Sequence, residues 1–149
     1  MTSSSRPSDP SDIPGSHIWG PANQLLDAID REDLDSRVRE GLPWVARAFS
    51  SLNWDWLVDE SERRARQNRL GLVVALAALS SPYLAVHQKL IAVAERIEKI
   101  RRDAWDTLCG RSMTKVERAR IRSEGFPIAA RWHIDSDLEL LFHACPRGW

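Results

Sequence analysis

Long hydrophobic runs are missing from this chain of 149 residues. The longest apolar stretch, Leu70–Leu79, has about half of the roughly 20 residues that a helix needs to cross a bilayer. Residues 1–16 lack the apolar segment that is typical of a secretory leader. We therefore expect a soluble, cytoplasmic protein in which the two cysteines, Cys109 and Cys145, are reduced thiols.

Motifs of common enzymes are also missing. The sequence contains no G-x-S-x-G elbow and no glycine-rich phosphate loop. His143 and Cys145 are closer together than the usual ligand pair of a zinc site, and Cys109 and His133 do not supply a second pair. His87 is expected to be an ordinary boundary residue. The sequence therefore predicts no catalytic residue, no metal site and no cofactor, and we expect that the protein is not an enzyme.

Glycine and proline are few, with seven and eight residues, and most prolines lie near the start of the chain. The middle of the chain is thus free to form helices. An apolar content of 43% and a charged content of 28% are typical of soluble globular proteins. Residues 1–16 are rich in serine, proline and aspartate, which predicts a disordered tail. Residues 17–149 are expected to form a single all-α domain.

Two long helices are expected at the centre of this domain, over about residues 53–80 and 82–108. Apolar residues recur in both segments at alternating steps of three and four, as in the seam of a coiled coil. Ser81 is a suitable cap, and Pro82 suits the first position of a helix. We therefore predict a long antiparallel helical hairpin, packed by short N-terminal and C-terminal helices.

The short helices are predicted from start and stop signals. One should begin at Pro21, and a second should run over Arg31–Glu40 and stop at Gly41 before a third begins at Leu42. After the hairpin, Met113–Ser123 has a capping-box pattern. Further predicted features are an N-cap at Asn53, either a helical turn or an extended piece over Ile128–Ile134, and a last helix through Leu138, Leu141 and Phe142.

Four residues of the hairpin are candidates for contact with a partner: Trp54, Trp56, Asn68 and Gly71. Tryptophans often anchor interfaces, and we expect Trp56 to join the N-terminal helices to the hairpin. Asn68 occupies a seam position, where it either fixes the pairing of helices or meets water at the edge. Gly71 inside a helix predicts the close approach of another element.

The net charge is zero, but its distribution is uneven. Residues 1–60 hold five basic and eleven acidic side chains, whereas residues 61–131 hold fifteen basic and seven acidic ones. A basic centre suits phosphate contacts, or it is a solvated face whose charges pair along the helices. The candidate nucleic-acid residues are Arg63, Arg66, Lys99, Arg102, Lys115, Arg118 and Arg122.

These patterns favour a small helical protein that binds another macromolecule and has a regulatory or adaptor role. The first hypothesis is protein–protein interaction, with a different protein or with a second copy as a homodimer. The alternative is a nucleic-acid-binding regulator that uses the basic central helices.

Overall fold

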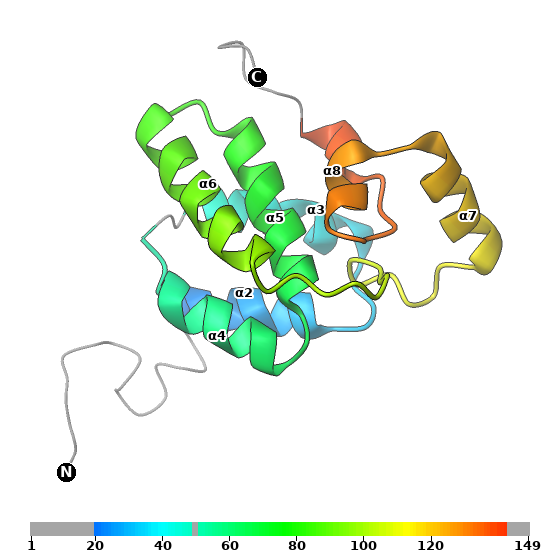
Figure 1. The fold of residues 1–149 in the computed structure, drawn as a ribbon, viewed down its shortest axis with the longest axis horizontal. Coiled ribbons are helices and arrows are strands. Elements are labelled where there is room, and N and C mark those ends of the chain that lie inside the picture. Colours follow the sequence, from blue (N-terminus) through cyan, green and yellow to red (C-terminus); the bar gives the residue numbers. More distant parts are fainter. Residues whose placement is uncertain (1–19, 49–50, 143–149) are drawn as a thin grey trace.

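The computed structural model describes residues 20–48 and 51–142, and within these ranges the fold is all-helical (Figure 1). The described residues form seven α-helices and one 3-10 helix, with only two isolated β-bridges and no strand. The all-α prediction is confirmed, while the predicted tail over residues 1–16 lies outside the described residues. The elements are α2 (Pro21–Asp30), α3 (Ser36–Ala48), α4 (Trp54–Arg63), α5 (Gln67–Ser80), α6 (Leu84–Glu98), α7 (Lys115–Glu124), α8 (Pro127–Arg131) and η2 (Leu138–Leu141).

Helix α5 is the centre of the core. Eleven of its 14 residues are buried, and it contacts α2, α3, α4, α6 and α8. The reason is the sequence Leu70–Leu79, which is apolar around its whole circumference, and such a helix is buried on all sides. No helix in the described ranges combines the length and hydropathy that a membrane crossing requires.

The first arm of the predicted hairpin is not one helix. Helix α4 ends at Arg63, and Ala65 takes a left-handed conformation with φ 59°. The amide of Ala65 donates to the carbonyl of Glu62 at 3.0 Å, and the amide of Arg66 donates to that of Ser61 at 2.7 Å. This is the Schellman ending of a helix, which usually has glycine at its left-handed position. The prediction of a continuous arm over 53–80 was wrong because alanine gives no such signal.

The second arm is also shorter than predicted. Helix α6 begins at Leu84 and ends at Glu98, whereas the prediction extended from 82 to 108. The chain then leaves the helix and forms two isolated bridges, Asp106 with Ile134 and Asp33 with Gly110. The packed pair α5 and α6 in Figure 1 is what remains of the predicted hairpin.

Helix α3 continues where a stop was predicted. It runs through Gly41 and contains Pro43 in its interior, so the predicted second and third short helices are a single helix. Leu42, Pro43 and Ala46 are buried, and α3 packs against α5. Burial of this apolar face offsets the loss of one backbone donor at the proline.

Several local predictions are confirmed. Asn53 caps α4 by accepting a hydrogen bond from the amide of Trp56, and Pro21 is the first residue of α2. Thr114 and Glu117 form a capping box at α7. The ambiguous Ile128–Ile134 segment is mostly helical in α8, and Leu138–Leu141 is a 3-10 helix instead of an α-helix.

Candidate functional site

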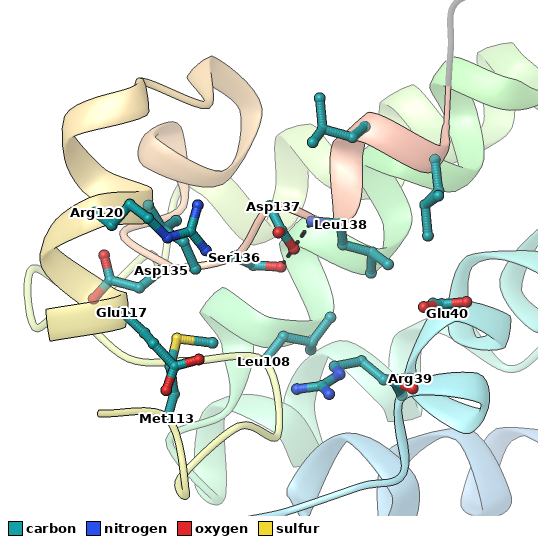
Figure 2. A pocket seen from close by; sticks show the side chains of 14 residues that line it. Arg39, Glu40, Leu108, Met113, Glu117, Arg120, Asp135, Ser136, Asp137 and Leu138 are labelled. Carbon is teal, nitrogen blue, oxygen red and sulfur yellow. Dashed lines mark hydrogen bonds between the residues drawn. The ribbon is translucent and has the colours of Figure 1, made fainter. Parts of the chain in front are cut away.

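A groove of about 390 Å³ lies between α3, α7 and the segment that ends in η2 (Figure 2). Its volume is within the range of roughly 300–1,000 Å³ that is typical of ligand pockets. Each of the three elements contributes one wall, so the groove exists only because they are brought together by the fold. The lining residues are Ser36, Arg39, Glu40, Leu108, Met113, Glu117, Arg120, Ile121, Asp135, Ser136, Asp137, Leu138, Leu140 and Leu141.

The apolar residues of the groove form a buried floor and an exposed rim. Leu108, Ile121 and Leu138 are at most 5% exposed and belong to the floor. Leu140 and Leu141 on η2 are 56% and 57% exposed. Leucines exposed to this extent next to a concave surface are a feature of binding sites.

Trp44 extends this apolar surface along α3. It lies four residues after the groove residue Glu40, and therefore on the same helix face. Its indole is 54% exposed and its ring centre lies 6.2 Å from that of Phe142, directly after η2. The guanidinium of Arg47 stacks on the indole at 3.6 Å and donates to the carbonyl of Ser80 at 2.7 Å, which holds the indole in place.

A buried carboxylate fixes the α7 wall. Asp135 is 1% exposed, and it accepts hydrogen bonds from Arg118 Nε at 2.8 Å and from Arg122 Nε and Nη2 at 2.9 and 2.7 Å. Burial raises the pKa of Asp135, but the hydrogen bonds and charges of Arg122 and Arg118 outweigh this effect and lower it. Ile121 is the only buried residue of α7, so this ion pair is a main attachment of the wall.

The other charges of the groove differ in how far they are neutralised. Arg120 pairs with Glu124 at 2.5 Å. Glu117 accepts hydrogen bonds from the amide and hydroxyl of Thr114, and these bonds lower its pKa. The side chains of Glu40 and Asp137 form no hydrogen bond or ion pair with any described residue.

The described side chains of this groove differ in protonation and hydrogen bonding from the usual acid–base and nucleophilic groups. A general acid at neutral pH needs a carboxyl whose pKa is raised, yet the pKa values of Glu117 and Asp135 are lowered. Among the residues that the structure describes, no histidine or cysteine lines the groove. The hydroxyl of Ser136 accepts a hydrogen bond from the amide of Leu138 at 3.1 Å, and it forms no hydrogen bond with a described carboxylate that could act as its base.

The four predicted partner residues lie mostly inside the fold. Trp54 is 5% exposed, and Trp56 is half-buried against the core. Asn68 is 4% exposed, and its amide donates to the carbonyl of Arg102 at 2.9 Å and accepts from the amide of Arg102 at 2.8 Å. Of the two alternatives for Asn68, polar pairing is therefore present, within the same chain. The role of these residues toward a partner stays a prediction.

Gly71 permits the close approach that its place in a helix predicts. The approaching group is the indole of Trp132, which follows α8 and is 2% exposed. A Cβ atom at position 71 would lie 2.3 Å from two carbons of that ring. The element that needs Gly71 thus belongs to this chain.

The seven basic candidates are divided between two places. In Figure 1, helix α4 lies at the lower left and helix α7 at the right. At the first place, Arg66 pairs with Asp30 at 2.9 Å, and Arg63 pairs with Glu60 at 3.2 Å. Arg102 donates to the carbonyl of Ala65 at 3.4 Å, while Lys99 and, on α7, Lys115 are exposed.

A second buried ion pair, at Arg69, was not expected from the sequence. The side chain is 3% exposed and donates to Asp106 Oδ2 at 2.7 Å and to Glu32 Oε1 at 3.1 Å. It also donates to the carbonyls of Ile29 and Arg31 at 2.9 and 2.8 Å. Burial lowers the pKa of Arg69, but these partners, Asp106 first, outweigh burial and raise it. Every partner belongs to this chain, so Arg69 joins α5 to the end of α2 and to Asp106 in the segment between α6 and α7.

The described candidates for metal ligands lie apart from one another, and each already contacts a backbone carbonyl. Cys109 is buried with its sulfur 3.3 Å from the carbonyls of Ala28 and Ile29, and His133 Nδ1 lies 3.1 Å from the carbonyl of Arg102. Within residues 20–48 and 51–142, no three His, Cys, Asp or Glu side chains are grouped as metal ligands. The other candidates, His143 and Cys145, lie outside the described residues.

The groove residues were not identified from the sequence. Glu40 and Asp137 look like ordinary surface charges, and the leucines of η2 look like the apolar face of a last helix. Their common location depends on contacts between segments that are far apart in the chain. Comparisons with models of protein families, with curated proteins and with solved structures gave no match.

Proposed function

We propose that this chain is a small helical binding protein with a regulatory or adaptor role, and that a partner protein contacts the groove between α3, α7 and η2. The observation that carries the proposal is the exposure of Leu140 and Leu141 beside a groove of about 390 Å³. Trp44 enlarges the same apolar surface. Tryptophan is enriched among the residues that anchor protein interfaces, and contiguous exposed apolar side chains mark interaction sites.

The alternative, binding of nucleic acid, has less support. Phosphate contacts require lysine or arginine side chains that are available to neutralise phosphates and so release the counterions of the nucleic acid. Arg66, Arg118 and Arg122 are instead paired with Asp30 and Asp135 of the same chain. The remaining exposed candidates, such as Lys99 and Lys115, belong to different parts of the fold.

Site-specific photo-crosslinking tests the proposal. A photoreactive amino acid replaces Leu141 in one variant and Leu84 in a matched control, which is 56% exposed on α6, away from the groove. In an extract of the source organism we expect a discrete protein adduct from position 141 only. The adduct should survive nuclease treatment. Equal adducts at both positions, or adducts lost with nuclease, would contradict the proposal.

A second copy of the chain is the other protein partner that the sequence suggests. Light scattering between about 1 and 100 μM, around the affinities of transient complexes, distinguishes it. A mass that rises with concentration in the wild type but not in a Leu141→Ser variant would identify the partner as a second copy.

The proposal includes a cytoplasmic location, as expected from the sequence. The free, buried thiol of Cys109 is consistent with a reducing compartment.

A further inference from the structure

The groove carries carboxylates that form no ion pair with a cation of residues 20–48 or 51–142. One stands on each wall: Glu40 on α3, Glu117 on α7 and Asp137 before η2. None of the three forms an ion pair with a described residue. In Figure 2, the carboxylates of Glu40 and Asp137 lie on opposite sides of the groove.

The two arginines of the lining offset this charge only in part: the charge of Arg120 helps to lower the pKa of Glu117, but neither arginine forms an ion pair with the three carboxylates. Arg120 is already paired with Glu124. The guanidinium of Arg39 lies against Gly110, where its Nη1 would be 2.9 Å from an added Cβ atom. Its charge acts on Asp33 and Cys109, on the side of the Asp33–Gly110 bridge.

The fourth acid of the lining, Asp135, is neutralised from outside the groove by Arg118 and Arg122. The groove therefore combines an apolar floor with walls on which negative charge is in excess. A complementary ligand needs an apolar group for the floor and cations at the walls. Complementary charge of this kind determines which partners a surface accepts.

We infer that the occupant of the groove is a protein segment with a large apolar side chain flanked by lysine or arginine. The apolar side chain packs on Leu108, Ile121 and Leu138, and the exposed Leu140 and Leu141 cover it. The flanking cations pair with Glu40 and Asp137. This inference rests on the proposed function and specifies the chemistry of its partner.

The test begins with selection from a random library of displayed peptides on the immobilised full-length chain. We expect enriched peptides in which a large apolar residue has a basic neighbour. The strongest peptide is then synthesised, and its Kd is measured for the wild type and for a Glu40→Gln/Asp137→Asn variant. Loss of two ion pairs should weaken binding about tenfold at low salt.

A matched variant, Asp59→Asn/Glu95→Gln, removes two exposed acids of α4 and α6 that lie outside the groove. Its Kd should stay within about twofold of the wild type, which separates local pairing from the effect of net charge. Thermal unfolding should be unchanged in both double variants because all four positions are exposed.

The outcomes separate the two proposals. Peptides that depend on Leu141 but carry acidic or only apolar residues would overturn the inferred chemistry and leave protein binding at the groove standing. No enriched peptide, or binding that Leu141→Ser does not affect, would overturn the groove as a protein site as well. Equal weakening by both double variants would show a general charge effect and would also overturn the inference.

Discussion

The indole of Trp132 lies against Gly71, so close that a Cβ atom at position 71 would come within 2.3 Å of the ring. Trp132 is 2% exposed, so a displacement of its indole would disturb a ring that is buried in the core. Gly71→Ala should therefore lower the free energy of unfolding by about 1–3 kcal/mol, although alanine is the better helix former.

Gly41→Ala is the matched control, because Gly41 is also inside a helix but has nothing within 4 Å of its added Cβ. This variant should be more stable than the wild type by up to about 1 kcal/mol. Urea unfolding followed by far-UV circular dichroism measures both. A Gly71→Ala variant as stable as the wild type would show that the contact is loose.

Asn68 clamps the backbone of Arg102 with two hydrogen bonds, at 2.9 and 2.8 Å. Asn68→Ala should reduce stability by about 2–3 kcal/mol, since it leaves a backbone donor and acceptor without their partner. Gln88→Ala, at an exposed position of α6, is the control and should change little. Hydrogen exchange at the Arg102 amide should accelerate in the Asn68 variant alone.

Ala65 takes the left-handed conformation that ends α4. Because this conformation disfavours residues with a Cβ atom, Ala65→Gly should stabilise the protein by roughly 0.5–1 kcal/mol. The same substitution at Ala92, exposed in the interior of α6, should destabilise it by about 1 kcal/mol. Opposite signs in thermal or urea unfolding are the expected result, and a loss at both positions would contradict it.

Asp135 makes stability depend on pH. Its pKa in the folded protein is lowered, so its contribution is complete above the unfolded pKa of about 4 and is lost as the pH falls through the folded pKa. Asp135→Asn should destabilise the protein by about 2–4 kcal/mol at pH 7. The difference from the wild type should shrink as the pH falls toward about 3.

The control for this pH series is Asp103→Asn, at an exposed position. Hydrogen exchange in α7 should also accelerate in the Asp135 variant, because α7 is attached by Arg118, Arg122 and the buried Ile121. A difference in stability that stays constant across the pH range would show that the charge of Asp135 is not what matters.

Burial raises the pKa of the Cys109 thiol to about 11, against the opposing charges of Arg69 and Arg39. Since the thiolate is the reactive form, alkylation of Cys109 by iodoacetamide at pH 8 should be about 100-fold slower than in the urea-unfolded chain. Mass spectrometry of the peptide that contains Cys109 measures this rate separately from that of Cys145. Equal rates in the folded and unfolded chain would contradict the burial.

The sequence by itself determined the features that depend on near neighbours in the chain. The caps at Asn53 and Thr114 involve residues three positions apart, and the helical content follows from scarce glycine and proline. The apolar segment Leu70–Leu79 makes up most of the buried helix α5, and Gly71 correctly indicated a close contact. Such signals act within one or two helical turns, so the local structure that they favour depends little on tertiary contacts.

Tertiary structure decided what depends on distant segments. Packing on α5 keeps α3 helical through Pro43. The left-handed conformation of Ala65 ends α4, so that α4 and α5 are two helices instead of one. Burial of Asp135 against two arginines places α7 beside η2, and only this arrangement turns scattered charges and leucines into a groove. The physical reason is that burial and ion pairing are properties of the assembled fold, and a local pattern does not specify which distant residue will be the partner.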